Sequence, residues 1–95
     1  MIMINEYRNA LRDLIQRLNN KGQANQVIVW QVLLDESLDA TLLSQRAYGS
    51  RDFVDVVMVA CEVNGIWEQL PLTKILLPQA RLVLELRKRY GVTNG

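Results

Sequence analysis

Two stop signals, Tyr48-Gly49 and Asn64-Gly65, constrain the fold most, because they divide residues 42–78 into short elements joined by tight turns. Glycine adopts the left-handed conformation that ends many helices, and Ser50 is well placed to cap a helix that starts after it. Proline then ends the stretch at Pro78. The pattern predicts a helix, a second helix and a short strand over residues 72–77.

The segment between the two stop signals, residues 52–63, carries conflicting signals. It is rich in valine, which favours a strand. However, Asp52, Asp55 and Glu62 fall within about one quadrant of a helical wheel, whereas a strand would place them on both faces. Burial overrides propensities of a few tenths of a kcal/mol, so we expect a buried helix. Its most buried face would comprise Phe53, Val56, Val57, Ala60 and Val63.

The best strand candidate is Val27–Leu34, which is rich in β-branched residues and contains neither Gly nor Pro. Its nearly continuous apolar character predicts a strand that is covered on both faces. The next helix starts after Asp35-Glu36, and both Ser37 and Asp39 are suitable N-caps for it. The residues expected to hold the core together are Trp30, Val32, Leu42, Phe53, Val57, Ala60, Ile66 and Ile75.

An N-terminal helix is expected over residues 5–19, with Asn5 as its cap and a stop at Asn19–Gly22. Apolar side chains recur along it at spacings of three and four, so they share one face. Two interpretations stay open, since this face can pack on its own domain or on a neighbouring subunit. The residues of the stripe are Ile4, Tyr7, Leu11, Leu14, Ile15 and Leu18.

Residues 79–90 allow both a strand and a helix. Leu82, Leu84 and Leu86 alternate as in a strand, whereas Leu82, Val83, Leu86 and Tyr90 would form one helical face. The basic cluster before Gly91 suits the C-terminus of a helix, so a helix is favoured. The chain is then a small α+β protein with a β-α-α-β core at 23–78, an amphipathic helix at 1–22 and a C-terminal helix and tail at 79–95.

Catalytic and metal-binding chemistry has little support in the sequence. The chain lacks histidine, which excludes His-based triads and His metal sites. The single cysteine, Cys61, is expected to be a small buried hydrophobe. The acidic group Asp35, Glu36 and Asp39 matches no complete calcium loop, so these acids are interpreted as a solvated loop and helix N-terminus. We therefore expect no enzyme activity, metal or cofactor.

Charge and hydropathy also exclude other partners. The basic group consists of Arg81, Arg87, Lys88 and Arg89. Because the net charge is only +1 and the last three residues are ordinary for a last helical turn, no nucleic acid is expected. No apolar run approaches the ~20 residues that a membrane span needs. The N-terminus lacks the pattern of a signal peptide.

Three motifs occur in a recognisable order: Arg46-Ala47-Tyr48-Gly49, Val63-Asn64-Gly65-Ile66 and Leu70–Pro78. The part of the chain that contains them, roughly half of it, resembles a LysM domain. The resemblance is closest to the LysM-like modules of contractile phage tails, such as the tail protein X family and LysM-bearing baseplate proteins. Two departures from the family pattern are Asp35-Glu36-Ser37-Leu38, where Gly-Asp-Thr-Leu is usual, and Leu72, where glycine is usual. Both lie in the loops that form the glycan groove of sugar-binding LysM domains.

The resemblance implies a structural component of a phage or phage-like tail baseplate or hub, present in several copies in a symmetric virion assembly and made in the host cytoplasm. The alternative that it implies is a peptidoglycan-binding module, with Trp67 stacking on a sugar and with Asn64 and Glu68 as hydrogen-bond partners. A simpler interpretation of Trp67 is packing against the C-terminal helix or a neighbour. The residues expected to touch partner proteins are Tyr7, Leu11, Leu14, Leu18, Trp67, Leu82, Leu86 and Tyr90.

Overall fold

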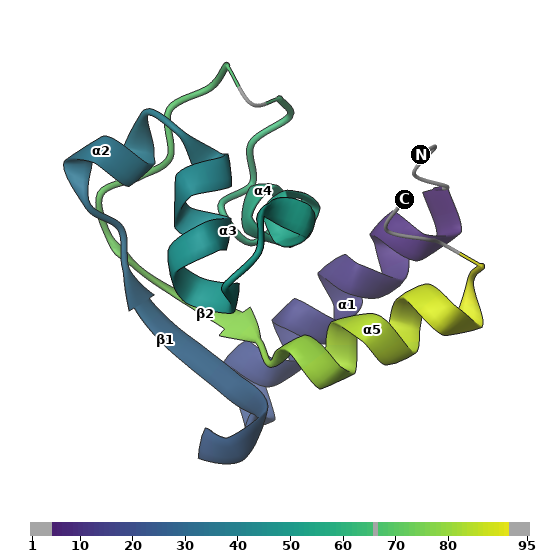
Figure 1. Ribbon diagram of the computed structural model, residues 1–95. Helices are drawn as coiled ribbons and strands as arrows, with labels where there is room; N and C mark the ends of the chain where they lie inside the picture. Colours follow the sequence, from purple (N-terminus) through teal and green to yellow (C-terminus); the bar gives the residue numbers. More distant parts are fainter. Residues whose placement is uncertain (1–4, 66, 92–95) are drawn as a thin grey trace.

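The computed structural model describes residues 5–65 and 67–91 and shows a small α+β protein (Figure 1), as predicted. Two antiparallel strands form its sheet, and three α-helices and one 3-10 helix of the described residues lie between these strands in sequence. The elements in order are α1 (Asn5–Lys21), η1 (Ala24–Gln26), β1 (Val27–Gln31), α2 (Leu34–Ser37), α3 (Ala40–Tyr48), η2 (Arg51–Phe53), α4 (Val54–Ala60), β2 (Lys74–Pro78) and α5 (Ala80–Arg89).

Both strands differ from their predicted bounds. β1 ends at Gln31 rather than Leu34, because the Glu36 carboxylate accepts a hydrogen bond from the Leu33 amide and starts α2 there. β2 begins at Lys74 and includes Pro78. Val29 lies opposite Leu76 at the centre of the pair.

Local capping signals explain the helices between the strands. Asp39, not Ser37, caps α3, because its carboxylate accepts from the backbone amides of Thr41 and Leu42 at 3.0 and 3.3 Å. Gly49 ends α3 in the predicted left-handed conformation, with φ of 76°. Ser50 then caps the next turn, as predicted, by accepting from the Asp52 amide at 3.1 Å.

The helical interpretation of residues 52–63 is correct, although the helix is divided into η2 and α4 and ends at Ala60. The charge pattern that favoured it was misinterpreted. Asp52 and Glu62 are exposed, but Asp55 is buried, so the three acids do not form one solvent face. Asp55 is buried because it pairs with Arg87 of α5.

One hydrophobic core joins the whole described chain. α1 packs against β2, α4 and α5, so the described residues of the predicted segments 1–22, 23–78 and 79–95 share one core. Of the predicted core, Val32, Phe53 and Val57 are buried. Trp30, Leu42, Ala60 and Ile75 are only partly buried, and Leu43 is the fully buried neighbour of Leu42. Ile4 and Ile66 lie outside the described residues.

Most of the side chains predicted to contact partner proteins pack in the protein's own core instead. Residues 80–89 are helical, because α5 buries Val83 and Leu86 against the core and leaves Leu84 exposed. The stripe of α1 packs on its own domain rather than on a neighbouring subunit, since it covers β2 and α4. The predicted partner residues that the fold instead buries in its own core are Tyr7, Leu11, Leu14, Leu18 and Leu86.

Candidate interaction surface

Large apolar side chains are exposed on two segments that meet beyond the sheet, α2 and the loop from α4 to β2. The exposed fractions are 51% for Leu33, 68% for Leu34, 61% for Leu38, 80% for Trp67 and 59% for Leu72. We call this set the α2 surface. Figure 1 shows α2 and the loop at the same end of the molecule, away from α1 and α5. Several large exposed apolar side chains at one end of a small protein indicate a candidate binding site.

Hydrogen bonds hold the two segments side by side. The Leu70 amide donates to the Ser37 carbonyl at 2.9 Å, and the buried Ser37 hydroxyl donates to the Leu70 carbonyl at 2.5 Å. The Val32 amide donates to the Thr73 carbonyl at 3.1 Å, which extends the β1–β2 ladder into this region. The α2 surface is therefore built on a fixed backbone rather than on an isolated loop.

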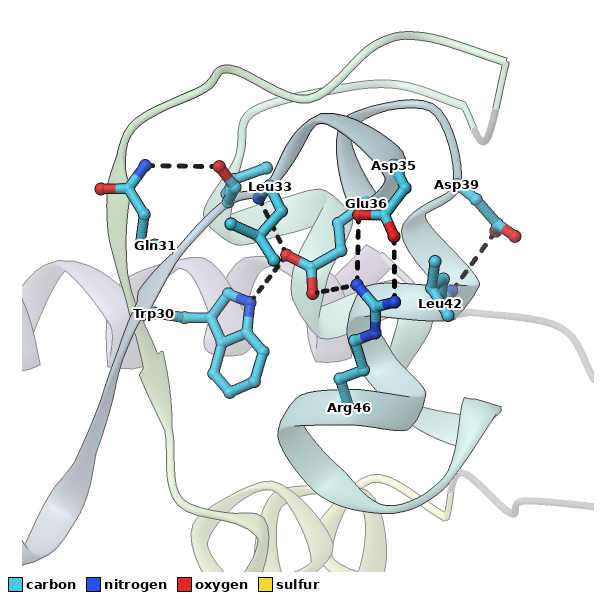
Figure 2. Close-up of polar contacts among 9 residues, drawn as sticks. Trp30, Gln31, Leu33, Asp35, Glu36, Asp39, Leu42 and Arg46 are labelled. Atoms are coloured by element: carbon cyan, nitrogen blue, oxygen red, sulfur yellow. Dashed lines mark hydrogen bonds and ion pairs between the residues drawn. The ribbon is translucent and has the colours of Figure 1, made fainter.

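The buried carboxylate of Glu36 holds α2 in place. The Glu36 side chain is fully buried, and one of its oxygens accepts from the Trp30 indole at 3.0 Å and from the Leu33 amide at 2.9 Å. Its other oxygen accepts from Arg46 at 3.0 Å. Arg46 also holds Asp35, at 2.9 and 3.1 Å, so its guanidinium lies between two carboxylates (Figure 2). The prediction of a solvated acidic group is therefore wrong for Glu36.

The titration of this cluster follows from its contacts. Burial raises the pKa of Glu36, but hydrogen bonds from the Leu33 amide, the Trp30 indole and Arg46 outweigh it, so the pKa is lowered overall. The hydrogen bonds from Arg46 lower the pKa of Asp35, and the Thr41 contact lowers that of Asp39. All three carboxylates are thus stabilised in the charged form, which suits a structural role better than proton transfer at neutral pH.

The alternative glycan site is assembled on one turn of the loop. The backbone amide of Asn64 donates to a Glu68 carboxylate oxygen at 2.8 Å, which closes the turn. The Trp67 ring lies over Gly65, where a Cβ atom would come within 2.3 Å of the ring carbons. Because the ring is exposed on its other side, it does not pack against α5. The structure thus brings Asn64, Trp67 and Glu68 together.

A second polar cluster lies in the core, where it joins α1, α4 and α5. Arg87 donates to Asp55 at 2.7 Å, to the Tyr7 hydroxyl at 3.1 Å and to the Asp52 carbonyl at 2.6 Å. The Tyr7 hydroxyl donates to Asp55 at 2.9 Å, and the guanidinium lies 4.8 Å from the centre of the Phe53 ring. Burial is the main reason that the pKa of Tyr7 rises to about 12. Arg87 is thus committed to the core and is not presented to a nucleic acid.

The remaining predicted partner residues lie along α5. Leu82 is half-buried and, with the buried Leu14 and Leu86, lines a shallow groove between α1 and α5. Tyr90 is half-buried at the end of α5 and packs against the core. The charged residues beside the groove are of both signs, namely Asp13, Arg17, Glu85 and Arg89.

Other chemical features are confined to the interior. Cys61 is buried, as predicted, and burial raises the pKa of its thiol to about 11, so it is not a reactive thiolate at neutral pH. Within residues 5–65 and 67–91, no group of three or more Cys, Asp or Glu side chains is placed to hold a metal ion. Among the helices of this described part, none has the length and apolar character needed to cross a membrane.

Comparison with known proteins found no family model, no curated protein and no solved structure that matches this chain.

Proposed function

We propose that this protein is a structural adaptor of a phage tail baseplate, or of a related contractile tail, which binds a neighbouring protein through the α2 surface. The observation that carries the proposal is that Leu33, Leu34, Leu38, Trp67 and Leu72 are exposed on a backbone that internal hydrogen bonds hold in place. A preformed apolar site loses little conformational entropy on binding, which suits a permanent part of an assembly.

The choice of assembly is supported by the motifs that resemble LysM-like tail modules, Arg46-Ala47-Tyr48-Gly49 and Leu70–Pro78. Arg46 and Tyr48 of the first motif have structural tasks in this chain, since Arg46 binds Glu36 and the Tyr48 hydroxyl donates to the Pro78 carbonyl at 2.6 Å. A baseplate component needs no catalytic group, and the polar clusters described above are suited to holding the fold.

The double variant Leu38→Ser, Leu72→Ser tests this proposal. The two leucines come from different segments of the α2 surface, and losing their burial in an interface should cost about 2–3 kcal/mol, roughly a hundredfold in affinity. We expect purified tail particles to contain the wild-type protein at a fixed ratio and to contain at least tenfold less of the variant, as measured by quantitative mass spectrometry.

Leu84→Ser is the matched control, because Leu84 is an exposed leucine on α5 and lies outside the α2 surface. It should enter particles at the wild-type ratio, and all variants should keep the wild-type melting temperature to within a few degrees, as surface substitutions do. Absence of the wild-type protein from particles, or equal incorporation of the double variant, would contradict the proposal.

Peptidoglycan binding is the second candidate function, and the exposed Trp67 ring beside Asn64 and Glu68 favours it. An aromatic face that is open to solvent can stack on the apolar face of a sugar ring. If this function holds, purified peptidoglycan should retain the wild-type protein and Trp67→Phe, but at least tenfold less Trp67→Ala in a sedimentation assay. The adaptor proposal predicts that none of the three is retained.

A further inference from the structure

The outer edge of β1 presents unpaired backbone groups to the surface. The Val32–Thr73 and Gln26–Gln79 hydrogen bonds, at 3.1 and 3.0 Å, mark the pairs whose backbone groups face each other across the sheet. Because such pairs alternate in an antiparallel sheet, the backbone N–H and C=O groups of Val27, Val29 and Gln31 point away from β2. The Val27 carbonyl accepts from the Gln79 side-chain amide, but Figure 1 shows no element of the described chain beside this edge.

The two edges of the sheet differ in how their outward backbone groups are paired. At the edge of β2, Pro78 has no N–H group and its carbonyl accepts from the Tyr48 hydroxyl. The edge of β1 is short and its Val27 carbonyl accepts from Gln79, but it carries no proline and no charged residue, since none occurs between Lys21 and Asp35. Natural proteins often place such residues on exposed edges, so their absence here leaves the edge open to another strand.

We propose that a second copy of this chain covers the β1 edge, with the two β1 strands antiparallel about a twofold axis at Val29. The twofold axis makes Val29 pair with its own equivalent, and it makes Val27 pair with Gln31 of the other copy. The donors and acceptors of one edge then meet those of the other, which forms a continuous sheet of four strands. The proposal is independent of the α2 surface and of the assembly to which the protein belongs.

The exposed side chain at the centre of β1 and the charges at the ends of the strand are compatible with a second copy at this edge. Val29 is 62% exposed in the single chain, although it stands at the centre of the strand. Pairing places it beside a second valine, a favourable β-branched pair. The antiparallel arrangement also brings α2 of one copy beside η1 of the other. The charged groups at these ends are the Asp35–Arg46 ion pair beside α2 and Lys21 and Arg81 beside η1, so Asp35 of one copy faces basic residues of the other.

The short strand limits the strength of the dimer. Pairing of two five-residue strands buries less than the ~1,200 Å² of a standard interface, so we expect a dissociation constant on the order of 100 μM. Within a symmetric assembly, multivalency makes such a weak contact effective.

Sedimentation equilibrium of the full chain from roughly 10 μM to 1 mM, which brackets that affinity, should show a monomer–dimer equilibrium. Val29→Lys places two like charges opposite each other and should weaken the dimer at least tenfold. Val29→Pro removes the central outward N–H group without touching the β1–β2 ladder and should do the same. Val29→Thr keeps both the N–H group and the β-branched shape, so it should dimerise within about twofold of wild type.

Isotope-filtered NMR on a mixture of labelled and unlabelled wild-type protein gives a second test that does not depend on variants. The proposed register places the Hα atoms of Ile28 and of Trp30 from the other copy in direct contact, so an intermolecular NOE between them is expected. A monomer over the whole concentration range, a dimer of unchanged affinity in Val29→Lys, or a dimer without this NOE would overturn the proposal.

Discussion

Replacing Arg87 with methionine is expected to destabilise the protein by about 3–5 kcal/mol, because the buried Asp55 carboxylate then loses the charge that compensates it. Methionine keeps much of the arginine stem, so the lost interaction is mainly electrostatic. The Tyr7 hydroxyl and the Asp52 carbonyl also lose a donor. Domains of this size are stable by roughly 5–15 kcal/mol, so the loss is a large fraction of the total. Urea unfolding followed by circular dichroism measures it.

Two further variants show whether the loss of the buried pair causes the destabilisation. Arg89→Met removes an arginine two residues away, whose contact with Glu85 is 3.9 Å long and exposed, and it should cost less than about 0.5 kcal/mol. Adding Asp55→Leu and Tyr7→Phe to Arg87→Met removes the carboxylate and the hydroxyl that lost their partner, though not the Asp52 carbonyl, and should recover most of the loss. If Arg87→Met proved no more harmful than Arg89→Met, the buried pair would not hold the three helices together.

The sequence predicts the parts of the fold that depend on neighbouring residues. Gly49 and Ser50 act where the local pattern places them, because a C-terminal glycine and an N-cap contact only the adjacent turn. The partners of Asp55 could not be predicted in this way. Tyr7 and Arg87 are 80 positions apart in the chain, and no periodicity indicates that an acid on one helix will meet a base on another.

The candidate interaction surface could not be predicted from the sequence for a similar reason. The apolar run Val27–Leu34 predicted a strand covered on both faces, but Val29, Leu33 and Leu34 are all exposed. The pattern of a fully buried strand and that of a strand followed by an exposed helical turn are alike in sequence. The strand ends where the Glu36 carboxylate accepts from the Leu33 amide, and the contact of Glu36 with Arg46 and the loop pairing at Leu70 hold α2 in this position. Trp67 was a site candidate through the resemblance to LysM domains, because it lies next to the predicted glycan groove.

The second large effect is expected at Glu36. Replacing it with alanine leaves the Leu33 amide and the Trp30 indole without their acceptor and leaves Arg46 with Asp35 alone, which should cost about 3 kcal/mol. Asp35→Asn is the matched control, since Asp35 binds the same guanidinium but is exposed, and it should cost much less than Glu36→Ala. Urea unfolding followed by the fluorescence of Trp30, in a Trp67→Phe background, measures both.

The same carboxylate should govern part of the acid response. Because the pKa of Glu36 is lowered in the folded state, the unfolded chain binds this proton more readily. Its contribution to stability is therefore complete above the unfolded pKa, near 4.5, and is lost as the pH falls through the folded pKa. Glu36→Gln cannot take up this proton, so its stability should be lower than that of wild type at pH 7 but should decline less steeply between about pH 5 and pH 3.

Glutamine is the appropriate replacement here because its amide oxygen can still accept one of the hydrogen bonds from Leu33 and Trp30. The unfolding free energies of wild type and Glu36→Gln should therefore converge as the pH falls. Parallel curves for the two proteins would contradict this prediction. They would assign the acid response to the other carboxylates whose pKa is lowered, Asp35 and Asp39, and would reduce Glu36 to a neutral hydrogen-bond acceptor beneath α2.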